Sequence, residues 1–319
     1  MSTPSPEPPI SGYAPLNPFS VGVASLAVLL WGGTAVANAF AIDQLPPVLV
    51  GAIRFGMASV FMLFWCRVEG ASLWLPRRRD WRNALILGLL LFLQISTFNI
   101  GLAASTASHA TLFVNSFIFW VAIYEQFIAR SIRLQWWQSG GLLLAAAGSA
   151  LLLLDNKASP TSVDRVTLFG DCVLALSGFF LGIKIVYTKH AVKDASPGAL
   201  ILWHDIIGTV MFLACSLAFE TMPKVTLTMP TILALVYAGL LVSGFCFAAN
   251  AWLLQQHGAS QVSVFSFATP VCGVTLGVLF RGDQLSLWLA LAGACVAVGI
   301  YLVNMPARQP VAGTGELVD

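Results

Sequence analysis

Five polar or aromatic side chains within one long apolar stretch are the first candidates for binding a solute. At about 100° per residue, His109, Ser116 and Trp120 lie on one stripe of a helix, and Thr111 and Asn115 form the neighbouring stripe. Imidazole, amide and hydroxyl groups at this spacing can hydrogen-bond a small polar molecule, and they can equally join neighbouring helices. Because so much polar surface is unfavourable against lipid, we expect this helix to line the interior of the protein.

The same argument extends to the other apolar stretches, where amide, hydroxyl and aromatic side chains fall at or near mid-span. Pro270 should bend one of these helices, either as a static kink or at a cavity or gate, because it frees a backbone carbonyl. We expect a central cavity to be lined by this set, with some members serving only as packing contacts. The candidate substrate-binding residues are Trp31, Asn38, Gln94, Asn99, His109, Asn115, Tyr237, Phe265 and Thr269.

Six ionisable side chains fall in or at the ends of the apolar stretches. An intramembrane ion is costly and is usually paired. Lys184 should pair with Asp205 or Glu125 in the same leaflet, unless it extends to the nearby interface. Arg54 should pair with Asp171. The candidates for an ion pair, or for coupling transport to an ion, are Lys184, Asp205, His204, Glu125, Arg54 and Asp171.

Two of the apolar stretches resemble each other. No Asp, Glu, Lys or Arg occurs between Arg82 and Glu125, and none occurs from Val225 to Phe280. Within these runs, ASHATLF at residues 107–113 recurs as ASQVSVF at residues 259–265. A charge-free run of that length is unfavourable in water, and its duplication indicates a membrane protein built from two similar halves.

The composition agrees and excludes several classes of protein. Of 319 residues, 58% are hydrophobic and 9% are charged, against roughly 25% charged in soluble domains. The formal net charge of +2 argues against a nucleic-acid partner. The sequence has no GxxxxGK[ST] loop and no HExxH, and its four histidines are dispersed. We expect no cofactor, nucleotide or metal, and partners limited to a small-molecule substrate and the lipid bilayer; the oligomeric state stays open, a monomer included.

Ten segments are long enough to cross a bilayer, which requires ~20 apolar residues each. They lie near 19–42, 47–68, 83–103, 106–129, 134–154, 167–189, 197–219, 229–251, 259–280 and 285–304. The expected fold is an all-α integral membrane protein of ten transmembrane helices in two inverted five-helix repeats. Its expected parts are a disordered N-terminus at 1–18, repeats at 19–154 and 167–304, an extracytoplasmic linker at 155–166, and a disordered C-terminus at 305–319.

The loops between these segments set their direction, because cytoplasmic loops carry an excess of Lys and Arg. With the N-terminus inside, the cytoplasmic basic residues are Arg67, Arg77, Arg78, Arg79, Arg82, Arg130, Arg133, Lys189, Lys193 and Arg308. The outer ones are Lys157, Arg165, Lys224 and Arg281. We therefore expect both termini in the cytoplasm. Since each half has an odd number of spans, the second half enters the membrane inverted, with a site near the midplane where the halves meet.

Two pairs of glycines have the spacing of a helix-packing motif. Gly178 and Gly182 share one helix face, as do Gly273 and Gly277. Small residues four apart let two helix backbones approach closely. We expect these faces to pack against other helices rather than to bind substrate.

The chain resembles the drug/metabolite transporter superfamily in its ten-helix EamA-type form over nearly its whole length in span count and halves, and its distinctive motifs lie mainly in the second half. The resemblance rests on LQQHGASQVSVFSFATP at 254–270, GVLFRGDQLS at 277–286 and GACVAVGI at 293–300, and Trp31-Gly32 also fits. These segments match the family's small residues after helix eight, mid-helix proline, acidic residue after helix nine and glycine-rich last helix.

Two positions depart from that family pattern. Asp283 stands where the family often has Glu, and Phe117-Ile118 stands where it often has a proline in helix four. The second departure bears on whether span four bends at all.

The resemblance implies a secondary transporter in a bacterial inner (plasma) membrane that exports amino acids or other metabolites through a cavity open to one side at a time. Carriage of another solute, such as a drug, sugar or nucleotide-sugar, is an alternative. A polytopic enzyme would need a clustered catalytic set, and a channel would favour rings of charge or carbonyl filters. Neither pattern occurs in the sequence, so we expect no enzyme.

The topology can be tested by cysteine labelling in intact cells. In a cysteine-free background, single cysteines at Arg78 and Ser131 should resist an impermeant maleimide until the membrane is permeabilised, because both positions are assigned to the cytoplasm. A cysteine at Lys224 should react without permeabilisation. Labelling from outside at position 78 or 131 would overturn the topology.

Overall fold

The protein is described here by a computed structural model that covers residues 17–70, 72–124, 135–152, 166–192, 195–222, 227–257 and 264–305. This part of the chain contains helices and no strand. Of the expected termini at 1–18 and 305–319, all but residues 17, 18 and 305 lie outside the described residues, as does the expected linker apart from residue 166.

Ten helical segments correspond to the ten expected spans, several of them built from two or three elements. The first half contains α1 (Pro18–Gly32) with α2 (Thr34–Ile42), α3 (Pro47–Glu69), α4 (Arg78–Leu102), α5 (Ala107–Val114) with α6 (Phe117–Ile123), and α7 (Trp136–Leu152). The second contains α8 (Leu168–Ala191), α9 (Pro197–Phe219), α10 (Met229–Val236) with the π-helix η2 (Tyr237–Cys246) and α11 (Phe247–Gln256), the 3-10 turn η3 (Val264–Phe267) with α13 (Ala268–Arg281), and α14 (Leu287–Asn304).

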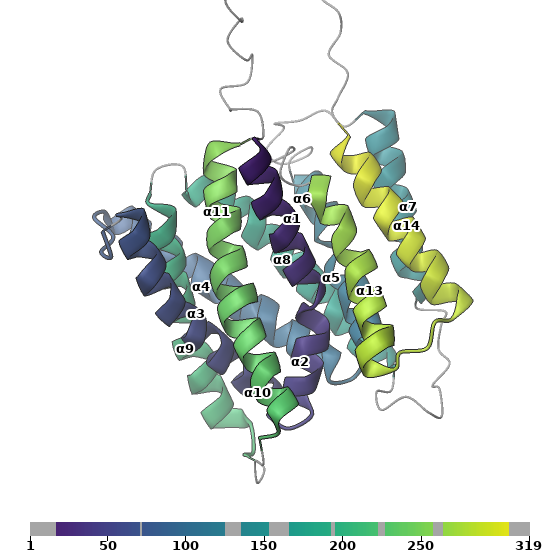
Figure 1. Cartoon of the computed structure of the whole chain (residues 1–319), viewed down its shortest axis with the longest axis horizontal. Helices are drawn as coiled ribbons and strands as arrows, with labels where there is room; N and C mark the ends of the chain where they lie inside the picture. The colour runs from purple at the N-terminus through teal and green to yellow at the C-terminus, as the bar shows by residue number, and fades with distance from the viewer. Residues whose placement is uncertain are drawn as a thin grey trace, which may run out of the picture.

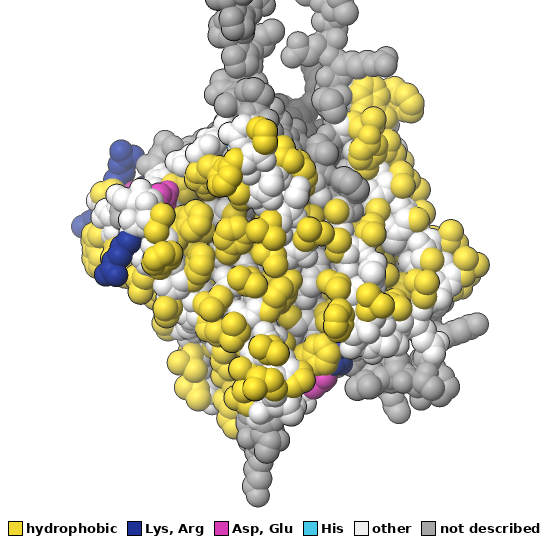
Figure 2. Space-filling model, in the orientation of Figure 1, with side chains coloured by type: hydrophobic (Ala, Val, Ile, Leu, Met, Phe, Trp, Pro, Cys, Tyr) yellow, Lys and Arg dark blue, Asp and Glu magenta, His cyan; other side chains and the backbone are white. Residues whose placement is uncertain are grey.

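The surface and the helix lengths both suit a bilayer. Among the described residues, six helical segments are long and apolar enough to cross a membrane, including Arg78–Leu102 and Met229–Leu253, and three more are apolar but shorter. Figure 2 shows hydrophobic side chains over the middle of one face, with charged side chains only near its edges. Large apolar groups such as Phe219, which is 84% exposed, therefore face lipid rather than water.

Turn residues in the sequence set where the helices begin and end. Pro47 and Pro197 open α3 and α9, where a missing N–H is no loss. Gly70 ends α3 with a φ of 67°, a conformation that glycine adopts without strain. The Thr106 hydroxyl accepts a hydrogen bond from the His109 amide and caps α5. These signals explain why the expected boundaries of these helices were close to those observed.

Helices at equivalent positions in the two halves pack against each other. α3 contacts α9, α5 contacts α13, and α7 contacts α14. The remaining large contacts also occur in matched form, because α4 packs on α9 as η2 packs on α3. In Figure 1, α1 begins and α14 ends at the same end of the bundle, which we call the terminus-bearing end. Matched contacts of this kind are the packing pattern of two repeats.

The α3–α9 pair shows that the repeats are inverted. The Glu220 carboxylate, just past α9, accepts hydrogen bonds from the backbone amides of Val48 and Leu49 at 2.8 and 3.0 Å. At the other end, Glu69 closes α3 and accepts a hydrogen bond from the backbone of Gly198 at the start of α9. Each helix thus ends in a carboxylate that caps the other, so the two helices are antiparallel. A carboxylate is favourable there because a helix N-terminus carries free N–H groups and partial positive charge.

The glycine pairs pack closely against span four, as expected. A methyl group on Gly182 of α8 would stand 2.6 Å from Cβ of Trp120. One on Gly273 of α13 would stand 2.6 Å from the Thr111 hydroxyl. The glycine faces of α8 and α13 therefore add no side chain of their own where α5 and α6 pack against them.

Removal of the Glu220 carboxylate should destabilise the protein. Glu220→Ala leaves two amides of α3 without their acceptor, a loss of about 1–2 kcal/mol by analogy with helix caps. Glu220→Gln keeps one oxygen and should lose less. Thermal unfolding of purified protein in detergent measures the effect, with Phe219→Ala as the exposed neighbouring control. Unfolding of Glu220→Ala at the temperature of the unmodified protein would contradict the capping role.

Candidate functional site

Four ionisable side chains gather in the interior, away from the ends of their helices. Arg54 comes from α3, Lys184 from α8, and His204 and Asp205 from α9, so both repeats contribute. Their exposed fractions are 1%, 3%, 2% and 0% in that order. Charges this deeply buried are costly unless compensated, which makes the interior cluster the candidate site.

Lys184 is held by an amide and an aromatic ring. Its Nζ donates to Oε1 of Gln94 at 3.2 Å and lies 4.8 Å from the centre of the Phe247 ring. Ser177 holds Gln94 through two contacts: the Ser177 hydroxyl donates to the backbone carbonyl of Gln94 at 2.9 Å, and the Gln94 side-chain Nε2 donates to that hydroxyl at 3.4 Å. Asp205 is the anionic neighbour of the Lys184 ammonium. The ammonium therefore combines a hydrogen bond, a cation–π contact and a more distant counter-charge.

Arg54 is only partly satisfied. Its Nη2 donates to the Ser243 hydroxyl at 3.0 Å, and its Nε lies 3.5 Å from the Ala238 carbonyl. Its Nη1 has no hydrogen-bond partner among the described residues. A buried guanidinium with a free N–H group is unusual, because buried polar groups are almost always bonded.

Asp205 carries the acidic charge of the cluster. Its Oδ1 lies 2.9 Å from Nδ1 of His204. That contact lies within ion-pair distance but lacks hydrogen-bond geometry, since neither oxygen of Asp205 has a hydrogen-bond partner in the described part of the chain. His204 Nδ1 also approaches the carbonyl of Ile201 at 3.2 Å. Asp205 is therefore a buried carboxylate with acceptor capacity to spare.

Phe247 lies between the ionic groups and other aromatic side chains. It was not among the expected site residues. Its ring lies 6.2 Å from those of Trp31, Phe55 and His204, and it also contacts Lys184. Phe247 is half-buried and follows directly after the π-helix η2. Only Ser243, four residues earlier, marks that helix face as polar in the sequence. The π-helix widens the turn and changes which residues share a face.

Four spans depart from regular α-helix. Span one breaks at Gly33, between α1 and α2, and span four breaks at Asn115 and Ser116, between α5 and α6. Span eight contains η2, and the described part of span nine changes from 3-10 to α geometry after Phe267. Irregular backbone at membrane depth is tolerated where it is buried in protein or lines a water-filled cavity.

At the end of the bundle opposite the terminus-bearing end, two polar contacts join the repeats. The Arg281 guanidinium of α13 binds the Asp43 carboxylate through Nη1–Oδ2 at 2.6 Å and Nη2–Oδ1 at 3.2 Å. Nearby, Asp283 accepts a hydrogen bond from the Ser108 amide at 2.8 Å. Both contacts join the second repeat to the first.

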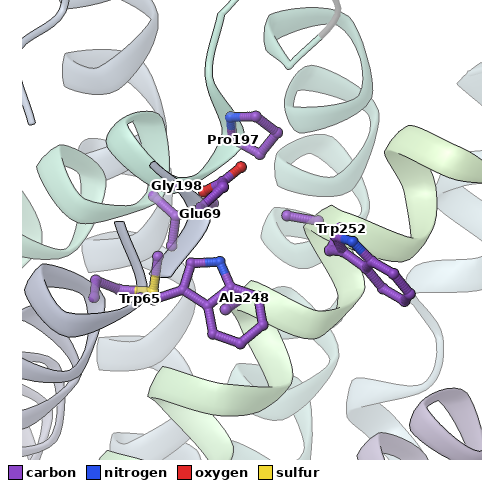
Figure 3. Close-up of a pocket in the computed structure, with 9 residues that line it drawn as sticks. Trp65, Glu69, Pro197, Gly198, Ala248 and Trp252 are labelled. Atoms are coloured by element: carbon purple, nitrogen blue, oxygen red, sulfur yellow. The ribbon is translucent and has the colours of Figure 1, made fainter. Parts of the chain in front are cut away.

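The terminus-bearing end holds a narrow hollow between α3, α9 and α11. Figure 3 shows Glu69 against Pro197 and Gly198, with Trp252 approaching from α11. The hollow has no space wide enough for a water molecule. Close by, the Ser20 hydroxyl and Nε2 of His257 are 2.7 Å apart.

Comparison with known proteins identifies the fold and the class of activity. The EamA-like transporter family matches the chain twice, over residues 19–154 and 168–305. The chain belongs to the EamA-like transporter family. It is therefore an integral membrane transporter built from two repeats, and the resemblance seen in the sequence is confirmed.

Named relatives of this EamA-like chain are also transporters. It is 25% identical over 287 residues to "Uncharacterized transporter YoaV" of Bacillus subtilis (strain 168), covering 88% of this chain and 95% of that protein. It is 23% identical over 300 residues to "Uncharacterized inner membrane transporter YedA" of Escherichia coli (strain K12), covering 89% and 92%. It is 24% identical over 293 residues to a "Probable amino-acid metabolite efflux pump" of Salmonella typhimurium, covering 88% and 93%.

A solved structure described as "Crystal structure of protein" shares this fold. Its TM-score is 0.67 at 19% identity, and the match covers 90% of this chain and 98% of that one. At that identity the likeness concerns the fold alone.

Several candidate substrate-binding residues lie away from the interior cluster of the EamA-like transporter. Asn38 donates to Asn99 at 2.8 Å, and Asn99 donates to the Pro47 carbonyl at 2.8 Å, so these amides join α2, α4 and α3. Asn115 bonds back to the Thr111 carbonyl at 2.7 Å. Each of these contacts is of the structural kind that joins or bends helices.

The other candidate substrate-binding residues have different neighbours. Trp31 and Gln94 adjoin the interior cluster through Phe247 and Lys184. Thr269 lies beside Gly32. The hydroxyl of Tyr237 donates to the Leu30 carbonyl at 2.5 Å, close to the break in span one, and Phe265 packs with Ala24 and Leu253.

The expected pairing of Arg54 with Asp171 is replaced by other contacts. Asp171 lies in the first turn of α8, where it accepts from the Ser105 hydroxyl at 2.6 Å and contacts Nδ1 of His109 at 3.1 Å. Arg54 instead extends toward Ser243 on η2. The expectation failed because sequence position gives the level of a Cα atom but not the direction of a long side chain.

The remaining expectations concern Lys184, Glu125 and Pro270. The direct partner of the Lys184 ammonium in the described part is Gln94, and Asp205 acts on it from further away. Glu125 lies outside the described residues. Pro270 is the third residue of α13, just after the 3-10 turn. Span four breaks although it has no proline.

A double-mutant cycle tests the coupling of Lys184 to Asp205. Lys184→Met alone removes the ammonium that neighbours Asp205, and Asp205→Asn does the converse, so each should destabilise the protein, by up to the ~3–5 kcal/mol of a broken buried pair. The double variant removes both charges and should be more stable than the sum of the single losses predicts. Unfolding of the four proteins in detergent gives the cycle, and strictly additive losses would show that the two groups do not interact.

Proposed function

We propose that this transporter exports amino acids, or metabolites of similar size and polarity, as a secondary carrier. The observation that carries the proposal is the interior cluster, whose ionic groups come from α3 in one repeat and from α8 and α9 in the other. Intramembrane ionisable groups mark solute or ion pathways. The name of the Salmonella relative supports an amino-acid metabolite as the cargo.

Alternating access is the mechanism that the inverted repeats favour, because two similar halves can exchange conformations and expose one site to either side. In this proposal both termini are cytoplasmic, in keeping with the exposed arginines Arg77, Arg78 and Arg79 near the terminus-bearing end. The Arg281–Asp43 pair is then an outer closure, and the Ser20–His257 contact is part of an inner one. Transport requires the two closures to open in turn.

The energy for export comes from a gradient in this proposal, since the sequence has no phosphate-binding loop of the GxxxxGK[ST] type. His204 and Asp205 are in contact and both can carry a proton, which makes proton coupling a defined alternative to simple facilitated export. The two modes differ in whether a pH gradient changes the final accumulation of solute.

Flux through proteoliposomes tests the proposed function. Vesicles containing purified protein and loaded with unlabelled amino acids should take up labelled amino acid by saturable exchange, because a carrier alternates one site between two sides. Protein-free vesicles are the control. An imposed pH gradient raises the final accumulation if protons are coupled and leaves it unchanged in facilitated transport. Ohmic current without saturation would contradict the proposal, as would conversion of the amino acid to a product.

A further inference from the structure

The interior cluster carries more positive than negative charge. Arg54 and Lys184 supply two cationic side chains, and Asp205 supplies the one carboxylate of the cluster, already in contact with His204. The salt bridges of the described residues do not include Arg54. Because an uncompensated charge is expensive at membrane depth, the cluster has the charge balance of a site that receives one negative charge.

Arg54 carries an N–H donor that has no acceptor among the described residues. Ser243 holds the Nη2 side of the guanidinium, while Nη1 is buried and has no partner among the described residues. A guanidinium is planar and presents paired N–H groups that match the two oxygens of a carboxylate. Ser243 thus positions the group and leaves a donor for an acceptor that the protein itself does not supply.

Lys184 is placed to share the same anion. Ser243 and Phe247 are four residues apart in span eight, and they contact Arg54 and Lys184 respectively. The guanidinium and the ammonium therefore both lie against that helix, and each is a charged neighbour of the other. Two like charges held together in a buried place repel each other unless an anion comes between them.

We propose that Arg54 and Lys184 form a subsite for the carboxylate group of the transported solute. The inference rests on the proposed carrier function and specifies the chemical class of its cargo. Trp31 and Phe247 adjoin the subsite and would contact the apolar part of the same molecule. One surplus positive charge and one free donor match a monoanionic carboxylate better than phosphate, which carries more charge and more acceptor oxygens.

Ligand binding to the purified protein in detergent tests the subsite without relying on transport. The probes are the twenty standard amino acids, the monocarboxylates acetate, pyruvate and lactate, and inorganic phosphate, each scored by the rise in unfolding temperature. The acid that stabilises most is then compared with its carboxamide. The acid should bind at least tenfold more tightly than the amide, because the amide lacks the charge that Arg54 and Lys184 require.

Variants assign the effect to Arg54. Arg54→Gln should weaken acid binding at least tenfold and bring the acid and the amide to similar affinities. Arg54→Lys keeps the charge but loses the planar guanidinium, so its affinity for the acid should lie between those of Arg54→Gln and the unmodified protein. This variant provides the measurement if Arg54→Gln does not fold. Arg78→Gln, at an exposed arginine, is the matched control and should bind as the unmodified protein does.

The outcomes separate this subsite from the carrier function itself. Equal binding of acid and amide, stabilisation by phosphate alone, or no stabilisation by any probe would overturn the carboxylate subsite. Saturable exchange of a solute without a carboxylate would overturn it while leaving the carrier function intact. Acid-selective binding that depends on Arg54, combined with absence of exchange in vesicles, would support the subsite and reject the carrier.

Discussion

Every helix start leaves backbone N–H groups without a partner inside the helix, and the α3–α9 pair satisfies them with its own carboxylates. Glu220 caps the start of α3, and Glu69 caps the start of α9, so each helix completes the other. This reciprocal arrangement fixes the register of the two helices. Arg54 on α3 and the His204–Asp205 contact on α9 depend on that register for their places in the interior.

Close packing brings the other half of the site to this pair. α4 lies against both α8 and α9, and its Gln94 accepts a hydrogen bond from Lys184 of α8. Glycine faces on α8 and α13 add no side chain of their own where span four packs against them, so these helices are in close contact. The ionic groups therefore come from helices of different repeats that pack closely together.

The spans, the two repeats and the membrane class were predictable, because they follow from long-range composition that packing does not alter. The contacts within the site were less so. Arg54 and Asp171 stand at similar levels in their spans, but their side chains extend to Ser243 and His109 instead of to each other. Phe247 escaped prediction for another reason: α-helical periodicity does not apply across the π-helix that precedes it.

That π-helix gives span eight a segment that can change its helical winding. Ten residues, from Tyr237 to Cys246, are wound more loosely than an α-helix. Such a stretch can tighten by moving each hydrogen bond to the next carbonyl along, without breaking the helix or exposing its backbone to lipid. In an α-helix each residue turns the chain by about 100°. Tightening by a single residue would therefore rotate the Phe247 ring away from Lys184. The ammonium of Lys184 would then lose its cation–π contact.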